Sequence, residues 1–83
     1  MLVQGGFMRY DRLPYERIRN LRIDNNLTQR EVAQILDVKQ NTYSQYELGV
    51  LKYSIEALIK LAKFYHTSVD YLLELTDNKK PYR

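Results

Sequence analysis

Hydrophobic residues recur at helical spacing, three and four positions apart, in every segment of the chain that follows Pro14. A strand pattern is missing, because no run of β-branched residues alternates with polar ones and no Asn-Gly or Asp-Gly pair marks a hairpin turn. The pattern therefore predicts an all-α fold. Its interruptions divide the chain into five helices joined by short connections.

The first helix is predicted over residues 14–25. Pro14 suits its first turn, where a missing N–H group costs nothing, and the carboxylate of Glu16 interacts favourably there with the helix dipole. Asn25 and Asn26 provide an end. Positions i, i+3 and i+4 of the inward face hold Ile18, Leu21 and Arg22.

Two short helices follow, separated by a brief turn. Thr28 and Glu31 form a capping box, which predicts a helix over Gln29–Leu36. The next helix is expected to span Gln40–Leu48 and to end at Gly49, a residue suited to the position after a helix. The inward residues of the pair are Val32, Ala33, Leu36, Tyr43 and Tyr46.

Serine caps predict the last two helices. Ser54 and Ser68 each precede an apolar helical stripe and can accept a hydrogen bond from its first turn. The final helix is expected to continue to Leu75, with residues 76–83 as a frayed tail or one available for contacts. The inward residues are Leu58, Leu61, Ala62 and Tyr65 in the earlier helix and Val69, Leu72 and Leu73 in the later one.

Size and composition indicate a small soluble globular protein. The 83 residues suffice for one domain, predicted over residues 14–75, with residues 1–13 as a partly disordered extension and residues 76–83 as a tail. Hydrophobic residues make up 45% and charged residues 28%, and no apolar run is long enough to span a bilayer. Residues 1–7 lack the features of a signal peptide and receive no role. We therefore expect a cytoplasmic protein without a separate effector domain.

Few side chains offer catalytic or metal chemistry. Cysteine is absent, which excludes disulfides, thiolate catalysis and cysteine-based zinc sites, and the one histidine, His66, is expected to be a turn residue. Because no glycine-rich phosphate loop is present either, we expect neither an enzyme nor a cofactor.

The charge permits a polyanion partner without requiring one. The net charge is +3, and six arginines lie within the first 30 residues against three carboxylates. An ordinary solvated face would have the same composition. The arginines are Arg9, Arg12, Arg17, Arg19, Arg22 and Arg30, and the carboxylates are Asp11, Glu16 and Asp24.

Residue types at set intervals narrow the role of the two short helices. A helix-turn-helix needs a small residue at its fifth position, where its helices pack closely, a turn-tolerant residue at its ninth, and bulky core residues at its fifteenth and eighteenth. Counted from Gln29, these positions hold Ala33, Asp37, Tyr43 and Tyr46. The spacing matches throughout and favours a helix-turn-helix over an ordinary helical corner.

The chain from residue 18 to residue 73 resembles the phage-repressor-like helix-turn-helix family of the XRE or Cro type. The likeness rests on the segments IRNLR, LTQREVAQIL, YSQYELG, LIKLAKFY and SVDYLL, which agree in order and spacing. It implies a five-helix lambda-repressor-like bundle whose third helix enters the major groove of DNA. It also implies a homodimer that reads a palindromic operator.

Four positions depart from the family pattern. Asp37 and His66 stand where the family usually has glycine, but both residue types adopt positive φ more readily than most. Ser54 stands near a frequent proline. Lys39 replaces a small hydroxyl residue before the third helix, which removes a side-chain cap worth about 1 kcal/mol and places a cation beside the DNA. We interpret Lys39 as a phosphate contact.

The outward face of the third helix is expected to read bases. Glutamine and asparagine pair with adenine N6 and N7, and each such pair adds about 1–3 kcal/mol of discrimination against a wrong base. The face carries no charge, unlike most merely solvated helices, although an ordinary exposed polar surface would also suit these residues. Its members are Gln40, Asn41, Ser44 and Gln45.

The resemblance also assigns supporting roles. It pairs Arg22 with Glu47 beneath the reading face, where a buried guanidinium needs a carboxylate. It places Gln29 on a phosphate and against Gln40, and it directs backbone amides near Leu48 and Gly49 to another phosphate. The other expected phosphate contacts are Lys39, Thr42, Lys52 and Tyr53, although Tyr53 could instead pack beneath its loop.

These features predict sequence-specific binding of double-stranded DNA by a transcriptional repressor, regulated through its concentration, a partner or degradation. Tyr71 and Tyr82 are candidates for a dimer contact. The alternative is a protein-interaction module, such as an antitoxin that binds a toxin through the same helical bundle.

Overall fold

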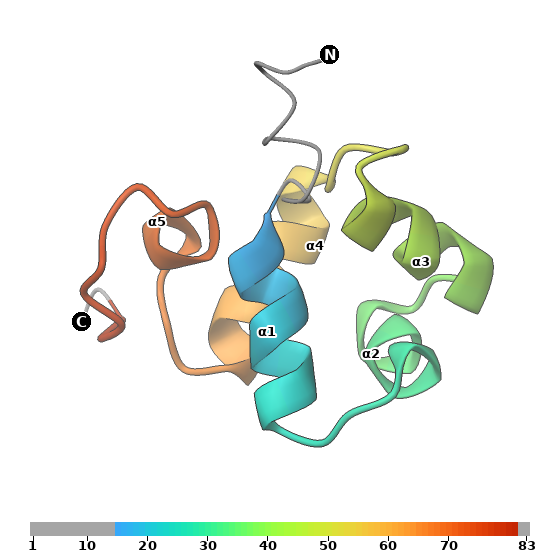
Figure 1. The fold of residues 1–83 in the computed structure, drawn as a ribbon, viewed down its shortest axis with the longest axis horizontal. Coiled ribbons are helices and arrows are strands. Elements are labelled where there is room, and N and C mark those ends of the chain that lie inside the picture. The colour runs from blue at the N-terminus through green and yellow to red at the C-terminus, as the bar shows by residue number, and fades with distance from the viewer. Residues whose placement is uncertain (1–14, 82–83) are drawn as a thin grey trace, which may run out of the picture.

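The computed structural model describes residues 15–81, and within them the chain forms helices and no strand (Figure 1). This confirms the predicted all-α fold. None of the helices in this part of the chain combines the length and apolar character needed to cross a membrane. The expectations for the extension over residues 1–13, for Pro14 and for Tyr82 lie outside the described residues. The helices are α1 (Glu16–Asp24), α2 (Gln29–Leu36), α3 (Gln40–Leu48), α4 (Ile55–Phe64) and α5 (Val69–Leu72).

Side-chain caps begin three of the five helices. Thr28 and Glu31 form both bonds of the capping box, with the Glu31 N–H 3.0 Å from Thr28 Oγ1 and the Thr28 N–H 2.8 Å from Glu31 Oε1. Ser54 and Ser68 each accept from the backbone N–H of the third residue of the following helix, at 3.0 Å. The hydroxyls satisfy N–H groups that have no partner within the helix. Lys39 precedes α3 without a side-chain cap, as expected.

Left-handed residues end the helices where the sequence predicted turns. Asp37 ends α2 with φ 60°, and Gly49 ends α3 with φ 79°, a conformation that glycine adopts without a Cβ penalty. Asn26 and His66 also have positive φ, 58° and 56°. The substitution of aspartate and histidine at the usual glycine positions therefore leaves the turn geometry intact.

Two helix boundaries differ from the prediction. Helix α1 begins at Glu16, after Tyr15 takes a left-handed conformation with φ 59°, and not two residues earlier. Helix α5 ends at Leu72 instead of continuing to Leu75. Glu74 has φ 64°, and the Leu75 N–H donates to Asp70 O at 2.8 Å, which closes the helix early.

The apolar faces of the helices meet in one core. Helix α2 packs against α3 and α4, α4 packs against α5, and α1 packs against α3. Tyr46 and Tyr53 stack with ring centroids 4.5 Å apart, and Tyr15 meets Tyr53 edge to face at 5.6 Å. Large side chains without solvent exposure at the centre are Ile18, Val32, Tyr43, Leu61 and Leu72.

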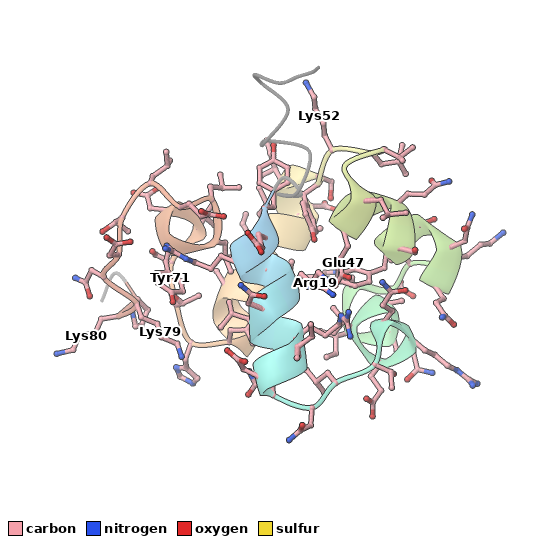
Figure 2. All side chains as sticks on the ribbon, in the orientation of Figure 1. Arg19, Glu47, Lys52, Tyr71, Lys79 and Lys80 are labelled. Atoms are coloured by element: carbon pink, nitrogen blue, oxygen red, sulfur yellow. The ribbon has the colours of Figure 1, made fainter. Side chains whose placement is uncertain are left out.

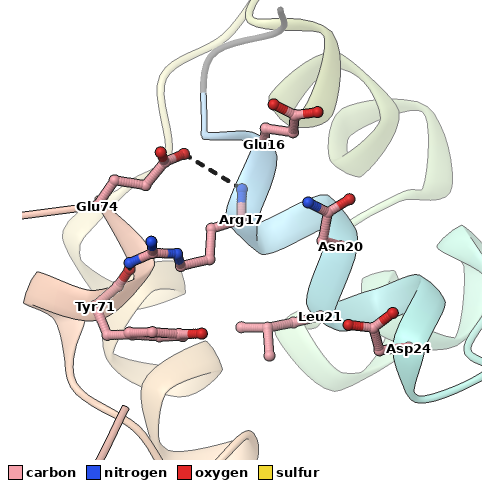
Figure 3. A pocket seen from close by; sticks show the side chains of 7 residues that line it. All are labelled: Glu16, Arg17, Asn20, Leu21, Asp24, Tyr71 and Glu74. Atoms are coloured by element: carbon pink, nitrogen blue, oxygen red, sulfur yellow. Dashed lines mark hydrogen bonds between the residues drawn. The ribbon is translucent and has the colours of Figure 1, made fainter. Parts of the chain in front are cut away.

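A cluster around Arg17, called the Arg17 link below, joins α1 to α5 and to the chain beyond it. One guanidinium nitrogen donates to Tyr71 O at 3.0 Å and Thr76 O at 2.7 Å, and the other pairs with Asp77 at 3.1 Å. The guanidinium also lies 4.2 Å from the centroid of the Tyr71 ring. It lines a cavity of about 300 Å³ between α1 and α5 (Figure 3). At least part of the expected tail is therefore bound to the bundle.

Candidate nucleic-acid interface

Helix α3 has two chemically different faces. Tyr43, Tyr46 and Glu47 are buried in the bundle. The outward face combines amide and hydroxyl side chains and carries no charge, so every side chain on it can donate or accept hydrogen bonds. Gln40 and Asn41 are exposed on this face, whereas Thr42, Ser44 and Gln45 are half-buried.

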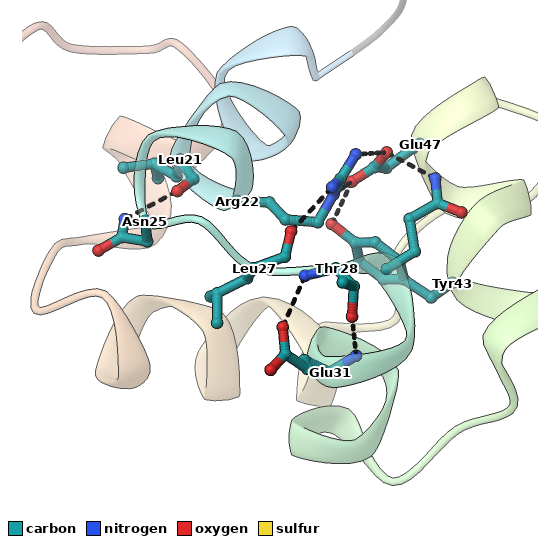
Figure 4. A network of polar contacts seen from close by, with 9 residues as sticks. Leu21, Arg22, Asn25, Leu27, Thr28, Glu31, Tyr43 and Glu47 are labelled. Carbon is teal, nitrogen blue, oxygen red and sulfur yellow. Dashed lines mark hydrogen bonds and ion pairs between the residues drawn. The ribbon is translucent and has the colours of Figure 1, made fainter.

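Four hydrogen bonds converge on the buried carboxylate of Glu47. Arg22 donates through Nε at 2.7 Å and through a terminal nitrogen at 3.1 Å, in the two-pronged geometry that suits guanidinium and carboxylate groups. Tyr43 donates through its hydroxyl at 2.5 Å and Gln29 through Nε2 at 2.9 Å. We call Arg22, Gln29, Tyr43 and Glu47 the Glu47 network (Figure 4).

The Glu47 network connects three helices beneath the outward face of α3. Arg22 comes from α1, Gln29 is the first residue of α2, and Tyr43 and Glu47 belong to α3. Arg22 also donates to Leu27 O at 2.9 Å, in the connection between α1 and α2. The ion pair that the resemblance implied is thus present, with side-chain exposures of 14% for Arg22 and 3% for Glu47.

The members of the network keep each other in the required protonation states. Burial by itself would raise the pKa of Glu47, but the hydrogen bonds from Arg22, Tyr43 and Gln29 outweigh it and hold the pKa below its ordinary value. The carboxylate raises the pKa of Arg22 in turn. Burial raises the pKa of Tyr43 above its ordinary range, so the hydroxyl retains the proton that it donates.

Exposed cations lie on both sides of α3. Lys39 precedes α3 and Lys52 follows it in the loop, where the Lys52 side chain points away from the bundle (Figure 2). Arg30, next to Gln29 in the first turn of α2, is exposed as well, although it was not among the phosphate contacts predicted from the sequence. Its position next to Gln29, the first residue of the motif, is the feature of the sequence that could have identified it as a candidate phosphate contact.

Tyr53 packs beneath its loop, which was the second of the two expectations for it. Its ring is buried against Tyr15 and Tyr46, and its hydroxyl oxygen is buried without a hydrogen-bond partner among the described residues. Burial raises its pKa above the ordinary range. A hydroxyl enclosed in this way does not reach a phosphate, so the assignment of Tyr53 as a phosphate contact is corrected.

The backbone after α3 also differs from the expectation. The Gly49 N–H donates to Tyr46 O at 3.1 Å, and the N–H groups of Val50 and Leu51 both donate to Gln45 O, at 2.9 and 3.2 Å. These amides close the end of α3, so they are already bonded within the chain and are not directed to a phosphate.

Comparison with known proteins agrees with the geometry. A family model described as Helix-turn-helix matches residues 18–72. The uncharacterized HTH-type transcriptional regulator YobD of Bacillus subtilis (strain 168) is 36% identical over 66 residues, which cover 80% of this chain and 59% of that protein. The cryptic phage CTXphi transcriptional repressor RstR of Vibrio cholerae is 42% identical over 57 residues, which cover 69% of this chain and 51% of the repressor.

The chain thus spans between half and three fifths of the length of these two relatives. Among solved structures, it is similar to the P22 c2 repressor protein, crystallised in complex with the synthetic operator 9T. The TM-score is 0.67 and the identity 32%, over 76% of this chain and 96% of that chain. This likeness confirms the predicted repressor-like bundle. Because the family model covers well over half of the sequence and coincides with the α1 to α5 fold, the chain belongs to the helix-turn-helix family.

Proposed function

We propose that this chain binds double-stranded DNA at specific sequences and represses transcription, with α3 placed in the major groove. The observation that carries the proposal is the uncharged polar outer face of α3, fixed to the bundle by a buried network. Two similarities support it: a relative named as a transcriptional repressor, and a similar structure solved with an operator.

The polar residues of α3 read the bases in this proposal. Gln40 and Asn41 are exposed at the start of the helix, the end that contacts base edges when such a helix enters the groove. Both side chains carry a donor and an acceptor, the combination that adenine presents in the major groove. Ser44 and Gln45 continue the same face, so the operator should hold A·T pairs at several contacted positions.

Cations on both sides of α3 and at the start of α2 hold the phosphates. Lys39 and Lys52 lie at opposite ends of α3, and Arg30 lies in the first turn of α2, the helix that crosses the DNA backbone in this motif. Thr42, half-buried at the edge of the reading face, contributes a hydroxyl. Such contacts position the protein on DNA but carry no sequence information.

A homodimer completes the proposal. A palindromic operator is read by two copies related by the same two-fold symmetry. Just beyond the reading face, four large apolar side chains are exposed where α3 ends and α4 begins, and they offer a second copy a surface to bury. They are Leu48, Val50, Leu51 and Ile55, with exposures of 55%, 66%, 40% and 76%.

The test is selection of bound duplexes from a random DNA pool, followed by titration of the selected duplex and a scrambled one at two salt concentrations. Specific binding should survive the higher salt better, because non-specific binding depends on counterion release. Equal affinity for both duplexes would contradict the proposal. In the Gln40→Ala variant, preference should weaken at one base position by about 1–3 kcal/mol.

A further inference from the structure

Gln29 is held by the protein itself. It is half-buried at the first position of α2, and its Nε2 donates to Glu47 Oε1 at 2.9 Å. A side chain whose only role was to hold a phosphate would be directed outward, as the exposed neighbouring Arg30 is. Gln29 instead turns its amide toward the interior of the helix-turn-helix.

This hydrogen bond is the contribution of α2 to the Glu47 network. The remaining donors are Arg22 from α1 and Tyr43 from α3 itself. Helix α3 is therefore held through one carboxylate from two sides, by α1 through Arg22 and by α2 through Gln29. Loss of the glutamine amide would leave a buried carboxylate oxygen with one donor fewer, which costs more than the loss of an exposed hydrogen bond.

The orientation of α3 decides whether several base contacts form at once. A bidentate pair between an amide side chain and adenine requires two hydrogen bonds of good geometry, so a small rotation of the helix weakens all such pairs together. Phosphate contacts tolerate such a change better, because they do not depend on one base edge.

We propose that Gln29 is a positioning residue, which acts through Glu47 on the orientation of α3 and thereby on base discrimination. This inference rests on the proposed function. It assigns to Gln29 a role in specificity through Glu47, in place of the contacts with a phosphate and with Gln40 that the resemblance implied.

The first test compares Gln29→Met with Gln34→Met on the selected and scrambled duplexes. Both variants replace glutamine by an unbranched side chain of similar length on α2, but Gln34 is exposed and is not a member of the Glu47 network. For Gln29→Met, affinity for the selected duplex should fall about tenfold, the loss expected for a hydrogen bond to a charged group, with little change for the scrambled duplex. For Gln34→Met, neither affinity should change. A Gln29→Met variant that weakens both duplexes equally is a lost phosphate contact and overturns the inference.

A double-mutant cycle with Glu47→Gln tests whether Gln29 acts through Glu47. If Gln29 acts through Glu47, Gln29→Met should cause less than about a twofold further loss in the Glu47→Gln background. Independent effects would multiply and would contradict the inference. Binding is measured at a temperature below the melting temperatures of the wild type, the two single variants and the double variant. If Glu47→Gln does not fold, the inference is tested by the comparison of the selected and scrambled duplexes alone.

Failure of the proposed function has a different result. A wild-type chain that selects no duplex contradicts DNA recognition, and the role of Gln29 in specificity falls with it. A wild-type chain that selects a duplex, with a Gln29→Met variant of unchanged discrimination, contradicts only the inference about Gln29.

Discussion

Glu47 is a charged residue removed almost completely from water, and such a group is tolerated only when its lone pairs are satisfied. The carboxylate accepts hydrogen bonds from Arg22, Gln29 and Tyr43. Desolvation of both ions offsets most of their attraction, so the pair contributes more to the placement of α3 than to net stability. Removal of one partner is nevertheless costly, because the other charge is left buried.

The variant Glu47→Gln should therefore lower the free energy of unfolding by about 3 kcal/mol at neutral pH. The folded pKa of Glu47 lies below its unfolded value, so the contribution of its charge is fully present above about pH 4.3 and is lost as the pH falls through the folded pKa. The difference in melting temperature between wild type and variant should be constant from pH 7 to pH 5 and should shrink in more acidic solution.

Glu56→Gln is the matched control, since Glu56 is an exposed carboxylate in the first turn of α4. Its loss should cost a few tenths of a kcal/mol, the scale of a charge and helix dipole interaction. Equal destabilisation by the two substitutions, or a difference that grows in acid, would contradict the role assigned to Glu47.

At the scale of residues, the sequence reveals roles that follow from an unusual residue in a regular pattern. An arginine within the apolar face of α1 indicates a buried carboxylate partner, but it was the resemblance to the repressor-like family that identified Glu47 as the partner of Arg22. Gln29 and Tyr53 lie at a helix start and in a loop, where periodicity does not determine the direction of a side chain. Their contacts with Glu47 and Tyr46 depend on how helices distant in sequence pack together.

At the scale of elements, α3 differs from α2, α4 and α5 in the residue that precedes the helix. Thr28, Ser54 and Ser68 satisfy N–H groups at the other helix starts, whereas Lys39 leaves those of α3 without a side-chain acceptor. The reading helix thus gives up local stability at the position where a cation lies beside the proposed DNA site.

Lys39→Ser should separate the effect of the missing helix cap on stability from the effect of the cation on DNA binding. The hydroxyl can cap α3 and should raise the free energy of unfolding by about 1 kcal/mol, measured by urea titration. The same variant should bind selected and scrambled DNA more weakly by similar factors, and the slope of log affinity against log salt should decrease by about 1.

Lys39→Ala is the control, because it removes the cation without adding a cap. It should weaken DNA binding like Lys39→Ser but should not stabilise the fold. If serine also gives no stabilisation, its hydroxyl does not cap α3 and the predicted cost of Lys39 is wrong. If only the selected duplex is affected, Lys39 contacts a base.

The boundaries of elements were predictable where one residue type dominates the local energetics. The capping box at Thr28 and the turn at Asp37 both follow from hydrogen bonding and backbone preferences within a few residues. The end of α5 was not predictable in this way, since Leu73 and Leu75 continue an acceptable helical pattern. Glu74 adopts a left-handed conformation that few glutamates favour, in a segment also bound by the Arg17 link.

At the scale of the molecule, the exposed apolar side chains beyond α3 predict that two copies of the chain assemble on one palindromic DNA site. Ile55→Glu should change the stability of the monomer by less than about 0.5 kcal/mol, because the side chain is exposed, but should prevent two copies from occupying one palindromic site. Sedimentation equilibrium of the complex with the selected duplex measures the number of copies bound.

Ile23→Glu is the control for added charge, since Ile23 is another exposed apolar residue, near the end of α1 opposite the loop that follows α3 (Figure 1). It should leave two copies bound. One copy per site in the wild type would contradict the homodimer and would favour a different protein, such as a toxin, as the partner of the apolar surface.

The Arg17 link makes a second prediction at this scale. Arg17→Lys keeps the charge but loses the planar fork that reaches two carbonyls and Asp77, so it should destabilise the fold by about 1–2 kcal/mol. Hydrogen exchange should accelerate at the amides of Glu74 and Leu75. Arg19→Lys, on the same helix, should have neither effect; equal exchange in both variants would show that the link does not hold this segment.

The Arg17 link also affects the order in which parts of the fold can form during synthesis. Arg17 is separated from Thr76 by 59 positions, so a ribosome that adds roughly 5–20 residues per second needs about 3 to 12 seconds to make the second partner after the first. During that interval a nascent chain can contain all of α3, and with it the residues of the reading face, while α1 still lacks the partner that ties it to the end of the domain. The surface proposed to recognise DNA is therefore complete in sequence before the bundle that supports it can close.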